Sequence, residues 1–203
     1  MEIGQRMYER HRKTGNAVPS WVIMDSRQRK HYLWGSAPPG QIPKQWLDSG
    51  YLVRADSITE LGRICGIDVA GLERTVARFN GFCQTGVDED YGRGGKAFDR
   101  CHGDPTVKPN PNLGPIEQPP FYAVRMYPGD VGTAGGVVTD EHARVLREDG
   151  SVIPGLYATG NCTASVVGRT YPGAGASIGA SFVFGYIAAH HGVRRPIARS
   201  SGV

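Results

Sequence analysis

The sequence of 203 residues has few cysteines and no closely spaced cysteine pair. Structural zinc sites need cysteine or histidine ligands at short, regular spacings, and a Cys-x-x-Cys pair is their usual sign. No secretory signal pattern is visible at the start of the sequence, so we interpret the cysteines as free thiols in a reducing compartment. No metal site is therefore predicted. The four cysteines are Cys65, Cys83, Cys101 and Cys162.

A long apolar run and a strong charge of one sign are absent as well. The apolar run from Ile178 to Ala189 is too short, and too rich in glycine and serine, to span a bilayer. The formal net charge is only +4, and the basic residues are scattered except in the C-terminal tail, whereas a nucleic-acid-binding face needs a coherent basic patch. In the mixed stretch from Arg27 to Trp34, we expect the aromatic side chains to pack inward and the charges to face solvent. We therefore expect no nucleic-acid partner and a cytoplasmic protein, with membrane association as the alternative.

The usual hydrolase patterns are also missing. The six histidines form no His-Glu-x-x-His motif. Gly175-Ala-Ser-Ile-Gly179 matches the Gly-x-Ser-x-Gly elbow of serine hydrolases, but that elbow needs a strand running straight into the serine, and here a loop precedes it. No Asp or Glu follows Asp149, so a downstream triad acid has no candidate. The sequence therefore disfavours a serine hydrolase.

Glycine, in contrast, is abundant. The 29 glycines are about double the average usage for this length, and many lie in the last third of the chain. There, residues 155–189 predict a short buried strand, a glycine-rich loop and an apolar helix. A helix that begins after such a loop offers unpaired N–H groups and a positive dipole end to an electron-rich ligand. This stretch is therefore the best candidate for a cofactor site.

The glycine spacing narrows the kind of site. Gly173-x-Gly175-x-x-x-Gly179 resembles a dinucleotide fingerprint with one extra residue, but it opens no βαβ unit and lacks the acidic residue about twenty positions on. We interpret it as the last strand and helix of a Rossmann-type domain, at the flavin end of the cofactor. Tyr171 stands beside these glycines, so its hydroxyl and a backbone N–H are candidates to bind one carbonyl oxygen. A tyrosine that merely fixes a tight turn is an equally good interpretation.

The remainder of the sequence predicts short, mixed elements. Ser57 and Glu60 match a capping box that begins a helix, Gly66 ends that helix, and Asp68 is expected to cap the next one. Residues 85–120 are loop-rich, and the acidic residues at 88–90 are expected in a solvated turn. The other expected elements are helices over 1–13 and 42–49, strands over 21–24 and 121–127, and a hairpin of 143–146 with 151–154 around Asp149-Gly150.

Several separated motifs together carry a family resemblance. The C-terminal ones resemble the end of the fumarate reductase and succinate dehydrogenase flavoproteins. Earlier segments agree in the right order, and the whole chain is similar to the C-terminal part of the 3-ketosteroid Δ1-dehydrogenases. The motifs are Gly155-Leu-Tyr-Ala-Thr-Gly-Asn161, Thr170-Tyr-Pro-Gly-Ala-Gly175, Phe184-Gly-Tyr-Ile-Ala188, and the segments 41–46, 78–82, 86–90, 104–113 and 128–133.

The resemblance implies a fold and an activity. It places residues 1–132 in an α+β catalytic domain, the fumarate-reductase-like cap, and residues 133–203 in the returning segment of an α/β Rossmann-type FAD-binding domain. Enzymes of this family remove hydrogens from C1 and C2 of a 3-ketosteroid and pass a hydride to flavin N5 of FAD, which an external electron acceptor then reoxidises. A 3-ketosteroid substrate and FAD are therefore the expected ligands.

The resemblance also assigns residues. Tyr171 matches the tyrosine that donates to the C3 carbonyl oxygen, and Gly175 matches the glycine whose backbone N–H helps it. The cofactor-binding matches are Gly160, Asn161, Gly173, Ser177 and Ile178.

Some features of the family have no match here. Its N-terminal glycine fingerprint and two further catalytic tyrosines lie in stretches without a counterpart in this sequence. The family often has histidine at the position of Arg169 and proline at that of Ala174. We therefore expect a fragment that neither binds FAD tightly nor turns over steroid alone, with an N-terminal flavin-binding chain as a partner in trans. The alternatives are a related flavoprotein acting on another enone or a dicarboxylate, and a non-catalytic remnant.

Overall fold

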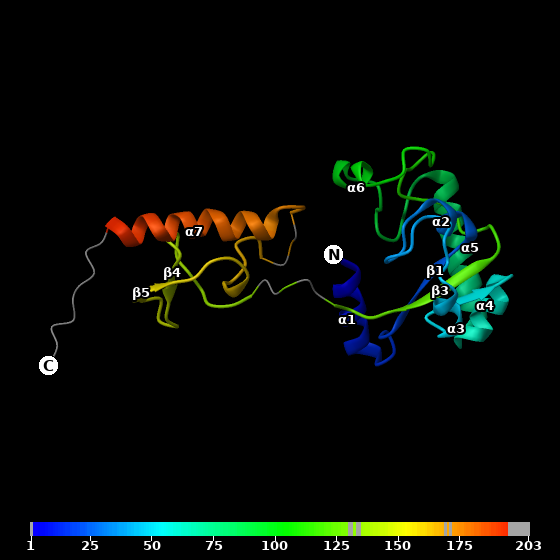
Figure 1. The fold of residues 1–203 in the computed structure, drawn as a ribbon, viewed down its shortest axis with the longest axis horizontal. Helices are drawn as coiled ribbons and strands as arrows, with labels where there is room; N and C mark the ends of the chain where they lie inside the picture. Colours follow the sequence, from blue (N-terminus) through cyan, green and yellow to red (C-terminus); the bar gives the residue numbers. More distant parts are fainter. Residues whose placement is uncertain (1, 130–131, 133–134, 169, 171, 195–203) are drawn as a thin grey trace. The chain divides into compact units, whose positions relative to one another are not determined.

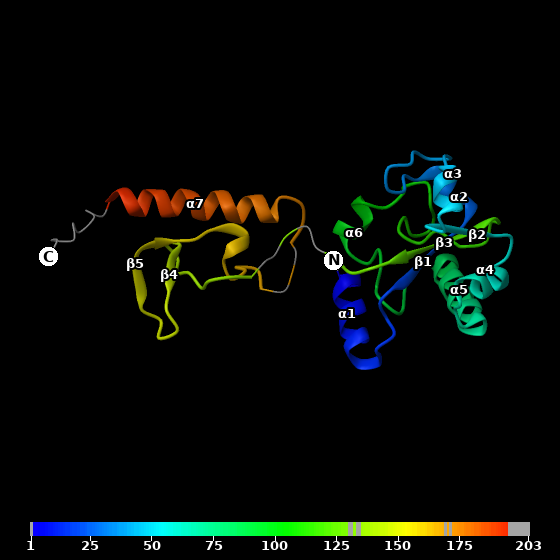
Figure 2. The ribbon, with the colours of Figure 1, turned by 60° about the horizontal axis from the view of Figure 1, so that its bottom comes forward.

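The computed structural model describes residues 2–129, 132, 135–168, 170 and 172–194 (Figure 1, Figure 2). Backbone contacts divide the chain into two compact units. The N-terminal unit is Arg6–Pro128, and the C-terminal unit is Gly129–Val203 together with Met1–Gln5.

A three-stranded antiparallel sheet organises the N-terminal unit. Its strands are β1 (Ser20–Met24), β2 (Leu52–Ala55) and β3 (Phe121–Met126), and β3 lies in the middle. The register pairs Val124 with both Val22 and Leu52. Because β3 is central and both its faces are covered, four successive residues from Phe121 are buried rather than every second one. The strands predicted at 21–24 and 121–127 are confirmed.

Side chains on the two faces of β3 form separate cores. Tyr122 and Val124 point to one face and pack with Met24 and Leu52, against which two partly buried tryptophans lie. The neighbouring residues, Phe121 and Ala123, point to the other face and pack with Ala55 and Leu61. Burying one such leucine contributes about 1.5–3 kcal/mol before conformational entropy is subtracted.

Six helices surround this sheet or extend from it. The first and third confirm the helices expected over 1–13 and 42–49, the second was not predicted, and the sixth is a single turn inside the loop-rich region (Figure 1). Their bounds are α1 (Glu2–Thr14), α2 (Ser26–His31), α3 (Lys44–Asp48), α4 (Ile58–Cys65), α5 (Val69–Thr85) and α6 (Ala97–Cys101).

The caps of α4 and α5 differ from each other. Ser57 Oγ accepts a hydrogen bond from Glu60 N at 3.1 Å, which confirms the predicted N-cap. The Glu60 carboxylate, however, accepts from Asp56 N at 3.0 Å rather than from the cap residue itself. Gly66 ends α4 with φ 67°, as predicted. Asp68 stands at the N-cap position of α5 (φ −56°, ψ 105°), and its carboxylate lies beside Gly71 in the first turn, but the predicted side-chain cap bond does not form.

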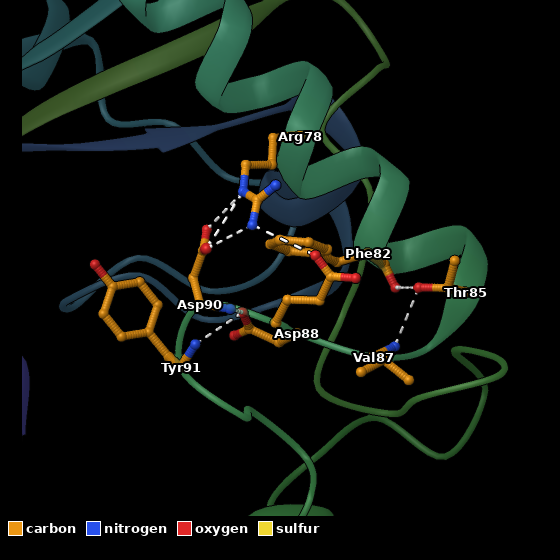
Figure 3. A network of polar contacts seen from close by, with 8 residues as sticks. Arg78, Phe82, Thr85, Val87, Asp88, Asp90 and Tyr91 are labelled. Atoms are coloured by element: carbon orange, nitrogen blue, oxygen red, sulfur yellow. Dashed lines mark hydrogen bonds and ion pairs between the residues drawn. The ribbon is translucent and has the colours of Figure 1, made fainter.

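The acidic turn after α5 is also not the solvated turn that the sequence predicts. The Asp88 side chain is 2% exposed, and its carboxylate accepts backbone N–H groups of Asp90, Tyr91 and Arg93 at 3.1–3.4 Å. Figure 3 shows this carboxylate beneath the exposed pair in which the Arg78 guanidinium meets Asp90 at 2.8 Å. Asp88 therefore fixes the loop from inside, whereas its acidic neighbours face solvent as expected.

Arg29 departs from the prediction in the same way. Its side chain is buried, with 2% exposure, and its guanidinium donates to the backbone oxygens of Tyr32 and Gln41 at 3.0 Å. The expectation that the charges of the 27–34 stretch all face solvent is wrong for this residue, because the two carbonyls replace the water that its guanidinium loses.

The C-terminal unit is a hairpin followed by a long helix. β4 (Arg144–Leu146) pairs antiparallel with β5 (Val152–Tyr157), which confirms the predicted hairpin. A short 3-10 turn, η1 (Gly160–Cys162), precedes the glycine-rich loop, and α7 (Ala176–Arg194) follows it. The prediction of a buried strand at 155–161 is wrong: Leu156 is 47% exposed, since among the described residues β5 has only β4 as a partner strand.

The α7 helix leaves a broad apolar face uncovered. No described side chain of α7 is buried, and Ile178, Phe182 and Tyr186, spaced four residues apart, are 65%, 73% and 66% exposed. No helix in the described part of the chain is both long enough and apolar enough to cross a membrane.

Candidate functional site

The glycine-rich loop leads directly into the N-terminus of α7. Ala176 N donates to Gly173 O at 3.2 Å, and Gly179 N donates to Gly175 O at 2.7 Å. Gly173 and Gly175 have φ values of 135° and 90°, conformations that residues with a Cβ rarely adopt. Among the described residues, the N–H groups of Ser177 and Ile178 have no backbone acceptor, so they are the free donors of the helix start.

The η1 turn is pressed against α7. Gly160 has φ 69°, and a Cβ placed on it would lie 2.3 Å from Ser181 Oγ. Ser181 lies one turn after Ser177 and donates to its carbonyl oxygen at 2.9 Å, so the hydroxyl is held in place. On the other side, a Cβ on Gly136 would lie 1.9 Å from Cys162 O. Glycines therefore allow the turn to pack closely against two neighbouring segments.

A pocket of about 520 Å³ lies between the η1 turn, the loop and the start of α7. Three residues predicted to bind cofactor line it: Gly160, Asn161 and Ser177. Its apolar part includes Val183 and Phe184, which lie two turns further along α7. The pocket's volume falls in the range typical of small-molecule and cofactor sites.

The other predicted residues lie around this pocket or away from it. Gly173 and Gly175 belong to the loop whose flanking residues Pro172 and Ala176 line the pocket. Ile178 does not line it; its side chain is 65% exposed. Tyr171 lies outside the described residues.

The electrostatic character of the pocket comes from backbone rather than from charged side chains. None of the described residues that line it carries a charge, and no acidic residue stands in the first turn of α7. The positive end of a 19-residue helix therefore faces the pocket without a competing carboxylate. Such an arrangement suits an uncharged, apolar ring system with one electron-rich edge, which is the chemistry of a flavin.

Sequence reasoning missed Val183 and Phe184 as lining residues of this pocket and Ser181 as the residue against which Gly160 packs. The signal was present, because Ser177, Ala180, Ser181 and Phe184 follow the three- and four-residue spacing of one helix face. This spacing is hard to recognise because most residues of α7 are apolar or small, so no polar face distinguishes the side that is turned to a ligand.

Comparison with known proteins places the chain in a class. A family model described as "FAD binding domain" matches residues 1–178, and the chain belongs to that family. FAD is accordingly the cofactor that the family match supports.

Among individual proteins, the chain is similar to the 3-oxosteroid 1-dehydrogenase of Mycobacterium tuberculosis, with 52% identity over 178 residues that make up 87% of this chain and 32% of that protein. It is 40% identical to the 4-oxocyclohex-2-ene-1-carboxylate 5-dehydrogenase of Sinomonas cyclohexanicum over 202 residues, which are 99% of this chain and 34% of the relative. Both proteins are relatives of this chain by sequence similarity.

A solved structure agrees. The 3-ketosteroid Δ1-dehydrogenase of Sterolibacterium denitrificans, crystallised in complex with 1,4-androstadiene-3,17-dione, superposes with a TM-score of 0.87 at 46% identity. The match covers 94% of this chain and 34% of that one. The mixed helix and sheet content expected from the sequence is therefore that of a known flavoprotein, and the chain spans about a third of the length of the relatives it matches.

Proposed function

We propose that this chain is the C-terminal part of an FAD-dependent dehydrogenase that introduces a double bond between C1 and C2 of a 3-oxosteroid. One observation carries the proposal: three of the five residues that the resemblance assigns to the cofactor, Gly160, Asn161 and Ser177, line one uncharged pocket at the start of α7. The 52% identity to a protein named 3-oxosteroid 1-dehydrogenase supports the steroid as substrate.

In this proposal the C-terminal unit holds the flavin. Gly160, Asn161 and Gly173 would bring backbone close to the cofactor, and the N–H groups of Ser177 and Ile178 would meet its electron-rich edge. FAD, when bound, supplies the hydride acceptor. The division at residue 132 follows from the same proposal, with residues 1–132 forming the substrate domain and residues 133–203 the returning FAD segment.

The chain's own contribution to the chemistry would be two donors aimed at one oxygen. The Tyr171 hydroxyl and the Gly175 N–H would both bind the C3 carbonyl oxygen of the steroid. A base in the family segment that this chain does not match would take the C2 proton while the C1 hydride is lost; negative charge then gathers on this oxygen, and donors already in place stabilise it without reorganisation. Removing one such donor typically lowers kcat by about 10²–10³-fold.

A further polypeptide segment would complete the site. The apolar stripe of Ile178, Phe182 and Tyr186 is more than three-fifths exposed in the described structure, and such a stripe normally packs against protein. We propose that it packs against the segment that, in full-length members of the family, precedes the third matched by this chain. That segment would belong either to the same polypeptide or to a partner chain in trans. The reduced flavin would then pass its electrons to an external acceptor.

Co-expression tests this proposal. The chain is produced alone and with the N-terminal two-thirds of the Mycobacterium tuberculosis relative, and both preparations are assayed for bound flavin absorbance and for dye reduction with 4-androstene-3,17-dione. We expect flavin and activity only in the co-expressed sample, and loss of activity with retention of flavin when Tyr171→Phe is introduced. Stoichiometric flavin and steroid-dependent dye reduction by the chain alone would contradict the need for a partner.

A second candidate substrate is a cyclic ketone that bears a carboxylate. The 40% identity over 99% of the chain to a 4-oxocyclohex-2-ene-1-carboxylate 5-dehydrogenase favours it. Carboxylate recognition needs a cation, and Arg169 is the only charged residue between Gly150 and Ala189. Substitution Arg169→Gln separates the two: KM for 4-oxocyclohex-2-ene-1-carboxylate would rise at least about tenfold if this arginine binds the carboxylate, whereas KM for a steroid would change little.

A further inference from the structure

A second pocket, which the proposed function does not use, lies wholly within the N-terminal unit. It encloses about 380 Å³ between the end of β1, the start of α2 and the loop that follows α6. Its lining combines charged side chains, such as Arg27 and Asp104, with the apolar Phe79 and Val107. None of the residues assigned to the flavin or to the C3 carbonyl belongs to it.

Unpartnered polar atoms are concentrated in this pocket. Among the residues that the structure describes, five side-chain polar atoms are buried without a hydrogen-bond partner, and three of them belong to residues that line the pocket. These are Arg27 Nε, Gln28 Oε1 and Asn112 Oδ1. Asn112 Nδ2 donates to Asp99 O at 2.8 Å, which leaves Oδ1 as its free acceptor. Buried polar groups are nearly always paired, so the cluster points to an occupant that supplies one acceptor and at least one donor.

The carboxylates of the pocket do not need that occupant. Asp25 accepts backbone N–H groups of Gln28, Glu117 and Gln118 at 2.9–3.3 Å. Asp104 accepts from the Thr106 and Tyr32 hydroxyls, and these hydrogen bonds, the Thr106 one first, lower the pKa of Asp104 to about 2.

Arg27 lies near Asp104, and its charge helps to lower the pKa of that carboxyl. It nevertheless makes no ion pair within 4.0 Å in the described part of the chain, unlike Arg93, the other arginine of the pocket, which lies 3.8 Å from the Asp88 carboxylate. The pocket therefore lacks a directly bonded acceptor for Arg27 Nε, for which a carboxylate is the strongest candidate, and a hydroxyl or similar donor for the amide oxygens.

Gly114 makes room for the Arg27 guanidinium. A Cβ placed on Gly114 would lie 1.9 Å from Arg27 Nη2, so the guanidinium occupies the space that a side chain would take. Gly114 does not have a positive φ, which means that alanine fits its backbone conformation. The substitution Gly114→Ala would therefore displace Arg27 and leave its charge unchanged.

We propose that this pocket binds a small hydroxylated carboxylic acid. The carboxylate would pair with Arg27, the hydroxyl would donate to Asn112 Oδ1, and a short carbon chain would lie against Phe79 and Val107. The volume exceeds that of a single water by about tenfold, given a water's share of about 30 Å³ in the liquid, which leaves room for a molecule of about seven heavy atoms and its solvent.

Three matched probes test the chemistry on the full chain: 3-hydroxybutyrate carries both groups, butyrate only the carboxylate, and 1,3-butanediol only hydroxyls. Binding is measured by ligand-observed NMR titration, while fluorescence of the tryptophans, all of which lie in the N-terminal unit, monitors the fold. We expect 3-hydroxybutyrate to bind at least about tenfold more tightly than 1,3-butanediol, which lacks the charge-assisted bond to Arg27, and about threefold to tenfold more tightly than butyrate, which lacks only the neutral bond to Asn112.

Single substitutions test which residue of the pocket makes each contact with the ligand. Arg27→Gln and Gly114→Ala should each weaken 3-hydroxybutyrate by at least about tenfold, and Asn112→Leu should remove its advantage over butyrate. Arg54→Gln, an equal charge change at an exposed residue outside the pocket, should have no effect. Equal affinity for the three probes, no binding by a folded chain, or binding that survives Arg27→Gln would overturn the proposal. None of these results depends on flavin binding or on steroid turnover.

Discussion

Replacing Gly160 by alanine tests how the η1 turn is held against α7. Two separate effects of the new Cβ lower the stability of the folded chain at this position. The residue would keep φ 69°, which is unfavourable for any residue with a Cβ, and its Cβ would lie 2.3 Å from Ser181 Oγ. Gly155 offers a matched control, because it has φ 78° but nothing within 4 Å of the place where a Cβ would stand.

The structure sets the size of each effect. The left-handed backbone alone costs about 1–2 kcal/mol, which is the whole loss expected for Gly155→Ala. Gly160→Ala adds overpacking against the serine hydroxyl, typically about 1–3 kcal/mol, so its loss should reach roughly 2–5 kcal/mol. Introducing Ser181→Ala together with Gly160→Ala removes the hydroxyl and should recover most of that second cost, since the remaining Cβ contact is 3.2 Å.

Hydrogen exchange measured by mass spectrometry on α7 peptides is a suitable assay, because it reports the free energy of opening of this helix separately from the N-terminal unit. Equal losses for Gly155→Ala and Gly160→Ala, or no recovery with Ser181→Ala, would refute the close contact between η1 and α7.

Three further predictions concern the N-terminal unit and are measured by urea unfolding followed by tryptophan fluorescence. Ser57→Ala should cost about 1 kcal/mol, whereas Asp68→Ala should change stability by less than about 0.5 kcal/mol, because only the serine caps its helix; equal losses would contradict this. Asp88→Ala should cost about 1–3 kcal/mol, because three backbone N–H groups lose their acceptor, and a neutral result would show that water replaces the carboxylate. The folded pKa of Asp104, about 2, lies below its ordinary value of 3.8, so its contribution is present above pH 4 and lost as the pH falls toward 2. The stability difference between the wild type and Asp104→Asn should therefore shrink between pH 5 and pH 2, and a constant difference would contradict the lowered pKa.

Local patterns in the sequence predicted local structure well. The strand before Asp25, the hairpin around Asp149-Gly150, and the helix between Ser57 and Gly66 all depend on neighbouring residues, whose turn and cap chemistry is visible in the sequence. Two errors came from long-range or backbone effects. Asp68 stands at the N-cap position, yet its side chain makes no cap bond, and Asp88 is buried because the chain folds back over it.

The candidate site was predictable only through the family resemblance together with the glycine pattern. The glycine loop marks a ligand site, but the closeness of Gly160 to Ser181 depends on how η1 packs against α7, and no spacing in the sequence encodes that contact. The second pocket was not predicted at all, since Arg27 and Asn112 are 85 positions apart and become neighbours only in the fold. The roles of Tyr171 and Gly175 in catalysis stay predictions.

The central claim is that this chain supplies the carbonyl-binding donors of a 3-oxosteroid dehydrogenase. The most direct measurement is steady-state kinetics of a chimeric polypeptide in which the chain replaces the matching third of the Mycobacterium tuberculosis relative. With 4-androstene-3,17-dione as substrate, we predict a flavin-containing enzyme whose kcat falls about 10²–10³-fold in Tyr171→Phe with flavin content unchanged. A flavin-containing chimera that does not oxidise the steroid, or one that Tyr171→Phe leaves fully active, would contradict the claim.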